Sequence, residues 1–229
     1  MNKTIKKLIT LGLAAVCLFG CTNSGTENKA TNNATNSAQQ QEEETDDTLA
    51  KLQSKYTDEA NKTIEGFADE DALPFIYNNL GKDMSSYKLK DINGKDVQIA
   101  NGEKTVIEFI RYDCSACIAS GETIKGAEKK FDGNGYRFIQ VFINGTEEDI
   151  DSYYKEAGIT HFNTIIPYSD EVEKMLVDLN LTYVPAFLFV DENKKVSLGM
   201  VGYTFSAEDF EELANDYAFP SKKLYEMTK

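Results

Sequence analysis

The chain has 229 residues and a formal net charge of −14, because 38 acidic residues outnumber 24 lysines and arginines. Such an acidic protein repels phosphate backbones and anionic lipid surfaces, so we exclude binding to either as its main role. A structural zinc site needs four ligands, and His161 is the single histidine, which disfavours that class as well.

The N-terminus has the order of a bacterial export signal. Lysines precede an apolar run from Leu8 to Phe19, which is shorter than the ~20 residues that span a bilayer. Gly20 and Cys21 follow and resemble a lipobox, in which the cysteine is diacylated and becomes the mature N-terminus. We therefore expect residues 1–20 to be a lipoprotein signal peptide and Cys21 to anchor the protein to the outer face of the cell membrane. An ordinary secretory signal is the alternative.

A polar segment separates the signal from the rest of the chain. Residues 21–47 are rich in Asn, Thr, Gln and Glu and contain no aromatic residue. Such a segment cannot bury enough apolar surface to offset its ordering entropy, so we expect a disordered tether. We expect a helical extension over residues 48–86 and a folded domain over residues 87–229, which is long enough for a sizeable core.

The first half of the folded part is predicted to contain a helix and a hairpin. Apolar residues spaced by three and four predict a helix from Leu49 to Phe67. The alternating segments Tyr87–Ile92 and Val97–Ile99 flank an Asn-Gly pair, which favours a tight turn. We therefore expect these two segments to pair as antiparallel strands.

The next three elements form the centre of the predicted fold. Apolar runs predict strands at Thr105–Ile110 and Gly135–Ile143, and the segment between them, Cys117–Phe131, is predicted to be a helix. A strand, helix and strand of these lengths form a βαβ crossover, so the two strands should be parallel.

The remaining elements complete a mixed sheet. Asp170 is expected to cap the second of three further helices, and Ser206 the third. Two strands joined by a turn form a hairpin near the C-terminus. The predicted fold is α/β, with a central mixed sheet and helices on both faces. The predicted helices are Glu147–Ala157, Asp170–Leu179 and Ser206–Tyr217, and the predicted strands are Ala186–Val190 and Val196–Val201.

The motif Cys114-Ser115-Ala116-Cys117 lies between the end of a predicted strand and the start of a predicted helix. Free N–H groups and the positive dipole end at a helix start stabilise a thiolate. We therefore predict that Cys114 is an exposed nucleophile and that Cys117, in the first turn, resolves its mixed disulfides. Ser115 and Ala116 are small and uncharged, so the helix end and nearby peptide groups must tune the thiolate.

Two residues outside the motif, Glu108 and Pro185, are candidates for roles in its chemistry. Glu108 is a carboxylate inside an apolar strand, where burial raises the pKa and suits it to take the proton of Cys117. The alternative is a strand-edge glutamate that is exposed or paired with a lysine. Pro185 immediately precedes a strand, either as a plain strand-entry proline or with a cis bond opposite the cysteines.

Together these residues resemble the thioredoxin-fold, membrane-anchored thiol–disulfide oxidoreductases of the TlpA/ResA-like branch. The match runs from about Tyr87 to Asp216 and includes the predicted hairpin, the C-x-x-C motif and the strand after Pro185. The resemblance implies a thioredoxin-like fold with an N-terminal β-hairpin extension, in which Cys114 is the nucleophile and Cys117 the resolver. It also implies a cis Pro185, with Tyr183 and Val184 contacting an extended substrate beside Ser115 and Ala116.

The sequence departs from this branch beside the motif. Asp113 stands where the branch usually has tryptophan, and a carboxylate there should raise the pKa of Cys114. Arg111 offsets that charge if its side chain folds back toward the site. Ala186 follows the proline where threonine is frequent, which alters the expected docking surface.

The resemblance implies an enzyme without a cofactor that exchanges disulfides with exported client proteins. We expect it to reduce those disulfides and to be re-reduced by a membrane electron donor of the CcdA-like type. A disulfide-forming oxidase or isomerase suits the exported compartment equally well. A binding lipoprotein that retains the fold without catalysis is the third possibility.

Overall fold

The structure is a computed structural model that describes residues 48–66, 68–202, 206–218 and 223–229. The predicted signal peptide, Cys21 and the tether lie outside the described residues. Within the described part of the chain, no helix is both long and apolar enough to cross a membrane.

A five-stranded sheet in the order β5-β4-β3-β6-β7 forms the centre of the molecule. The predicted βαβ crossover is confirmed, because β3 pairs with β4 in parallel, and β4 pairs with β5 in parallel. β6 is antiparallel to both β3 and β7, which makes the sheet mixed as predicted. The strands are β3 (Lys104–Ile110), β4 (Tyr136–Phe142), β5 (Ile165–Ile166), β6 (Ala186–Val190) and β7 (Val196–Val201).

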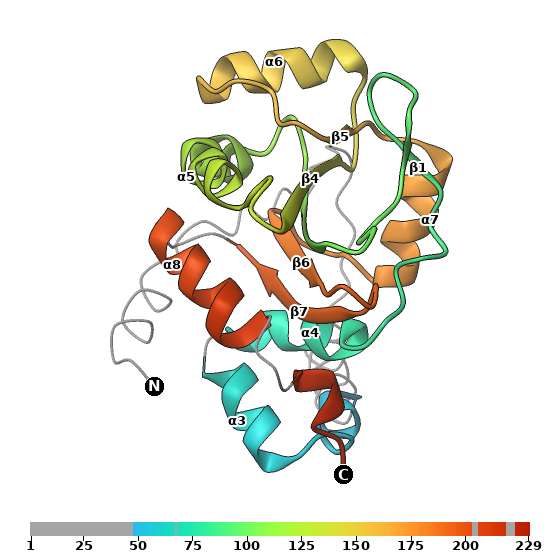
Figure 1. Cartoon of the computed structure of the whole chain (residues 1–229), viewed down its shortest axis with the longest axis vertical. Helices are drawn as coiled ribbons and strands as arrows, with labels where there is room; N and C mark the ends of the chain where they lie inside the picture. The colour runs from blue at the N-terminus through green and yellow to red at the C-terminus, as the bar shows by residue number, and fades with distance from the viewer. Residues whose placement is uncertain (1–47, 67, 203–205, 219–222) are drawn as a thin grey trace, which may run out of the picture.

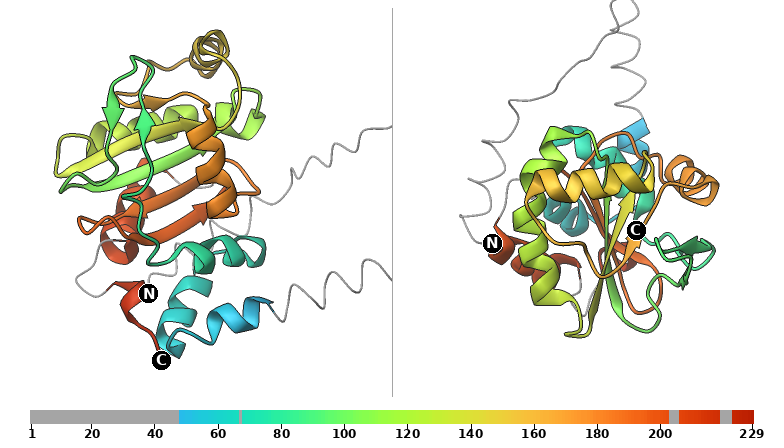
Figure 2. Two further views of the ribbon diagram at one scale, coloured as in Figure 1. Left: turned by 90° about the vertical axis from the view of Figure 1, so that its right-hand side faces the viewer. Right: turned by 90° about the horizontal axis from the view of Figure 1, so that it is seen from above.

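Helices cover both faces of this sheet (Figures 1 and 2). On one face α5, α6 and α8 pack over a core rich in phenylalanine and tyrosine. On the other face α7 and the hairpin of β1 and β2 cover a separate aliphatic core. The helices are α5 (Ser115–Phe131), α6 (Glu147–Ala157), α7 (Asp170–Leu179) and α8 (Ala207–Leu213), and the hairpin strands are β1 (Leu89–Lys90) and β2 (Asp96–Val97).

The N-terminal extension differs from its prediction. The helix expected over residues 49–67 is broken: residues 48–53 are helical, and α3 (Asp58–Glu65) starts again after Thr57, whose hydroxyl accepts a hydrogen bond from the Ala60 N–H. The break is set by the other end of the chain. The Thr57 N–H donates to the carbonyl of Met227 at 2.8 Å, so this segment pairs with the C-terminal residues beside η4 (Leu224–Glu226).

The rest of the extension covers the free edge of the sheet. η2 (Glu70–Ala72) leads into α4 (Leu73–Asn79), which packs against β7. After α4, the Gly81 N–H donates to the Val196 carbonyl at 2.7 Å, and the Val196 N–H donates to the Lys82 carbonyl at 3.0 Å. These bonds occupy an edge strand that would otherwise be open to pairing with another chain.

Three helix boundaries also differ from prediction. The cap of α7 is Ser169, whose hydroxyl accepts from the Val172 N–H, so the prediction of Asp170 as the cap is wrong. The C-terminal helix ends as a π-helical turn, η3 (Ala214–Ala218). Most important for the site, α5 begins at Ser115 rather than Cys117, which makes Cys114 its N-cap.

Candidate active site

Both cysteines lie at the start of α5, just beyond the end of β3. Cys114 is half-buried with extended backbone, whereas Cys117 is fully buried in the first helical turn. The Cys117 N–H donates to the Cys114 sulfur at 3.2 Å. Cys114 therefore fills the N-cap position that an oxygen-bearing side chain usually takes, and its sulfur lies at the positive end of the helix.

This placement divides the acidity of the two thiols. The pKa of Cys114 is lowered to about 6, first by a hydrogen bond from the Cys117 thiol, then by the N–H groups of Cys117 and Ala116 and the charge of Arg111, against the effect of burial. The pKa of Cys117 is raised because its thiol donates to Cys114 and because it is buried. The nucleophile and resolver predicted from the sequence thus have opposite acidities.

The loop before β6 brings Pro185 to the cysteines. The Val184–Pro185 peptide bond is cis, as the resemblance implied. The Cys114 thiol faces the Val184 carbonyl with a sulfur–oxygen distance of 3.9 Å. Tyr183 precedes them with 53 % of its surface exposed. The half-buried Cys114 thiol, the cis Val184–Pro185 peptide and the exposed Tyr183 ring therefore lie in one part of the structure.

Glu108 lies beneath the cysteines in the middle of β3. Side chains alternate along a strand, and Glu108 shares the face of Val106 and Ile110, which pack in the core under α5. It is fully buried, so the alternative of an exposed edge glutamate is wrong. Burial raises its pKa to about 8, and the negative charges of Cys114 and Glu128 act in the same direction.

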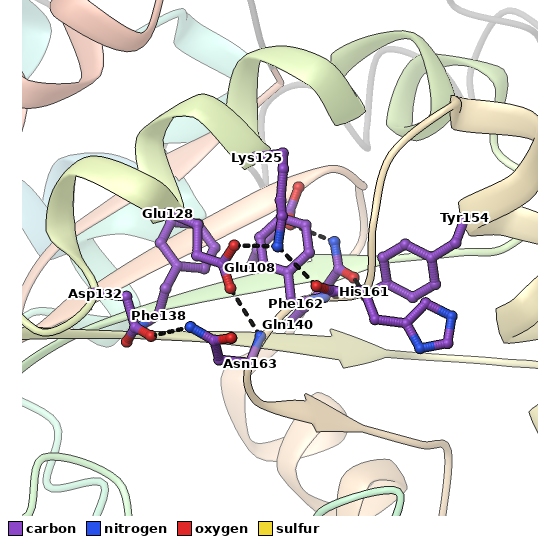
Figure 3. A network of polar contacts seen from close by, with 10 residues as sticks. All are labelled: Glu108, Lys125, Glu128, Asp132, Phe138, Gln140, Tyr154, His161, Phe162 and Asn163. Carbon is purple, nitrogen blue, oxygen red and sulfur yellow. Dashed lines mark hydrogen bonds and ion pairs between the residues drawn. The ribbon is translucent and has the colours of Figure 1, made fainter.

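Gln140 is the polar partner of Glu108, and sequence reasoning missed it. The parallel register places Gln140 of β4 opposite Glu108, and its Nε2 donates to Glu108 Oε2 at 2.7 Å (Figure 3). The Tyr154 hydroxyl, from α6, donates to Gln140 Oε1. The available signal was a lone amide inside the apolar run of β4, which has no periodicity to mark it.

The loop above the cysteines holds Asp113 in an ion pair. Arg111 donates to both carboxylate oxygens of Asp113, from Nε at 2.9 Å and from a terminal nitrogen at 2.8 Å. Asn144, also missed from the sequence, donates to Asp113 at 3.1 Å and accepts from the Tyr112 N–H. These bonds lower the pKa of Asp113, so its carboxylate stays charged. The Arg111 side chain folds back and offsets that negative charge, as the sequence allowed.

A second buried pair lies beside Glu108. Lys125 donates to Glu128 and to the His161 carbonyl, the latter at 2.7 Å, and Glu128 accepts from the Asn163 N–H (Figure 3). The His161 side chain is half-exposed and lies 3.2 Å from Asp151. Across the described residues, no three His, Cys, Asp or Glu side chains gather in a group suited to a metal ion.

Comparisons with known proteins bear on the fold. No protein-family model matches the chain, and no curated protein matches it. The thioredoxin domain of a thiol-disulfide oxidoreductase from Bacteroides vulgatus is 18% identical, with a TM-score of 0.50 over 59% of this chain and 98% of that chain. A thioredoxin-family thiol:disulfide interchange protein from Chlorobium tepidum is also 18% identical, with a TM-score of 0.50 over 61% of this chain and 97% of that chain.

This likeness, together with the sheet order and the helices on both faces, defines the class of fold. The chain has a thioredoxin-like α/β fold. Its C-x-x-C pair lies at the start of the helix that follows the central strand β3.

Proposed function

We propose that the chain is a thiol–disulfide oxidoreductase that reduces disulfides in exported proteins through Cys114 and Cys117. One observation carries the proposal: the Cys114 sulfur caps α5 and lies 3.9 Å from the Val184 carbonyl beside a cis proline. A half-exposed thiol with a pKa lowered to about 6 is mostly thiolate at neutral pH. The thiolate is the species that attacks a disulfide.

In the proposed reaction, the Cys114 thiolate attacks one sulfur of a client disulfide and expels the other as a thiolate. Cys117 then loses its proton, attacks Cys114 and releases the second client sulfur. The client gains two electrons and the Cys114–Cys117 pair loses them as it forms a disulfide. Tyr183 and Val184 are the residues that we expect to hold the client backbone, together with the helix start at Ser115 and Ala116.

We place this activity outside the cytosol on the basis of the sequence. A signal peptide over residues 1–20, a diacylated Cys21 and a tether over residues 21–47 would hold the folded part at the outer face of the membrane. Continued reduction of clients there requires a source of electrons. A membrane donor of the CcdA-like type, which the family resemblance implies, would re-reduce the pair.

A disulfide-forming oxidase is the second candidate, and the acidity of Cys114 favours it. Stabilising the Cys114 thiolate stabilises the reduced pair, which makes the pair more oxidising. A pKa of about 6 lies between the ~7 of thioredoxin and the ~3.5 of DsbA. A reduction potential near ~−270 mV would support the reductase, and one near ~−120 mV would establish the oxidant instead.

Trapping of clients tests whether the protein exchanges disulfides at all. Cys117→Ser leaves Cys114 able to attack but removes the resolving thiol, so mixed disulfides with clients should accumulate. Cys114→Ser is the matched control and should trap none. If Cys117→Ser captures no partner through a reducible bond in cell-surface extracts, the protein is a binding lipoprotein and the oxidoreductase proposal fails.

A further inference from the structure

Gln140 is a buried amide with both of its ends engaged. Nε2 donates to Glu108 Oε2, and Oε1 accepts from the Tyr154 hydroxyl (Figure 3). The Tyr154 oxygen itself accepts from the Phe162 N–H at 3.5 Å, so its one hydrogen is directed to Gln140. With the Tyr154 hydroxyl donating to Oε1, the amide presents its Nε2 donor to Glu108.

The fixed amide leaves the two oxygens of Glu108 unequal. Oε2 is engaged by Gln140, whereas Oε1 is buried and has no hydrogen-bond partner among the described residues. An unpaired, buried carboxylate oxygen is costly when it is charged. Binding a proton at Oε1 removes that cost while the bond from Gln140 to Oε2 remains in place.

We propose that Gln140 is a positioning residue for the resolving step, because it holds Glu108 with Oε2 engaged and Oε1 as the oxygen that accepts the Cys117 proton. The inference rests on the proposed function and adds a residue to it. In this step the S–H bond of Cys117 breaks and its proton goes to Oε1. A bond forms between the two cysteine sulfurs, the bond from Cys114 to the client breaks, and its electron pair leaves on the client sulfur.

The groups around Glu108 explain why one hydrogen bond matters there. Cys114, the N-cap of α5, and Cys117 and Glu128 within that helix lie near Glu108. Lys125 is paired to Glu128. The groups near it on α6 are Tyr153 and Tyr154, and the residue opposite it on β6 is Phe187. Burial and the negative charges raise the pKa of Glu108 to about 8, and the bond from Gln140 acts against them. Among the described residues, Gln140 is the one donor to this carboxylate.

The experiment measures two quantities in the full, reduced protein. Carboxyl NMR gives the pKa of Glu108 without any substrate. Stopped-flow reaction with the aromatic disulfide dithiobis-nitrobenzoate gives two releases of nitrothiobenzoate, the first on attack by Cys114 and the second on resolution by Cys117. The pH dependence of the second release reports the proton acceptor.

The variants remove the donor and its support. Gln140→Leu should raise the pKa of Glu108 by about one unit or more and move the pH midpoint of resolution upward by the same amount. Tyr154→Phe frees the amide and should shift both quantities in the same direction by less. Tyr77→Phe is the matched control, because its buried hydroxyl donates to an amide oxygen, Asn61 Oδ1, at 3.0 Å in the extension. It should shift neither quantity.

Unchanged values in a folded Gln140→Leu protein would overturn the inference, and so would a shifted pKa of Glu108 with an unmoved midpoint of resolution. If Gln140→Leu does not fold, Tyr154→Phe decides by the same two criteria. Failure of the proposed function has a different signature. Cys117→Ser would then capture no clients, although the NMR titration and the reagent kinetics behaved as expected.

Discussion

Two carboxylates flank the cysteine pair, and their surroundings differ in almost every respect. Asp113, in the loop above, is exposed and accepts hydrogen bonds from Arg111 and Asn144. Glu108, in the strand below, is fully buried and accepts one bond from Gln140. The pKa of Asp113 is lowered and that of Glu108 is raised to about 8.

Position in the fold, and not residue type, therefore determines whether each carboxylate stays charged or can exchange a proton. Hydrogen bonds from Arg111 and Asn144, together with exposure to solvent, keep Asp113 ionised at moderate pH, so it contributes a constant charge. Burial brings Glu108 to the pH range in which it can gain and lose a proton. The two cysteines differ in the same way: Cys114, which is half-buried, is ionised, and Cys117, which is fully buried, is protonated.

The largest expected effect comes from removing the titratable carboxyl of Glu108, in the strand below the cysteines. Glu108→Gln keeps the shape of the side chain but accepts no proton from Cys117. General-base catalysis typically contributes ~10²-fold or more, so the resolving step should slow by about that factor near pH 8 while attack by Cys114 persists. Two-phase kinetics with an aromatic disulfide separate the steps. Equal rates of resolution in the two proteins would remove Glu108 from the mechanism.

The same variant should change how stability depends on pH. Below pH 4.5, the ordinary pKa of a glutamate, the carboxyl is protonated in both folded and unfolded chains. Between there and about pH 8 the unfolded chain is ionised and binds fewer protons, so the free energy of unfolding falls as pH rises. The full cost above pH 8 is on the order of 5 kcal/mol. Denaturant titrations should show Glu108→Gln gaining stability over the natural protein across this range, and parallel curves would refute the raised pKa.

A smaller effect is expected from replacing Arg111, the cation in the loop above the cysteines. Arg111→Gln removes a positive charge that favours the Cys114 thiolate and leaves Asp113 without its main partner. The pKa of Cys114 should rise by about half a unit to one unit, which far-ultraviolet absorbance of the thiolate measures. Lys130→Gln is the control, because that lysine pairs with Glu208 and Glu211 on the surface. A shift of equal size in the control would show that net charge acts, and not the position of Arg111.

The two regions also differ in how far the sequence predicts them. The strands β3 and β4 are encoded locally by apolar runs, and their prediction is confirmed. The C-x-x-C pair is likewise visible in the sequence as a cysteine spacing, and its redox role stays a prediction. The partnership of Glu108 with Gln140 depends on the register of two parallel strands, which no local pattern specifies. The start of α5 was missed because cysteine is an uncommon cap, although its sulfur accepts the Cys117 N–H.

The extension gives the same lesson at larger scale. Apolar spacing favoured one helix over residues 49–67, and the spacing is indeed helical on either side of Thr57. The break arises where Tyr56 and Thr57 pair with the last residues of the chain, Met227 and Thr228. A contact between residues so far apart in sequence overrides local propensity and leaves no periodic signal.

The smallest expected effect comes from Asp113→Asn. The sign of the resulting change in the pKa of Cys114 shows how Asp113 and Arg111 act on the thiolate. The substitution removes a negative charge beside Cys114 and also releases Arg111 from its ion pair. If the charge of Asp113 dominates, the pKa of Cys114 falls by a few tenths of a unit; if the anchoring of Arg111 dominates, it rises. We expect a fall, because Asn144 and the loop still hold the backbone and the freed guanidinium keeps its charge near the sulfur. Asp96→Asn, in the exposed pair with Lys90, is the control and should leave Cys114 unchanged. A rise would mean that Asp113 promotes the thiolate through Arg111. The prediction that a carboxylate in the place of tryptophan raises the pKa of Cys114 would then be wrong.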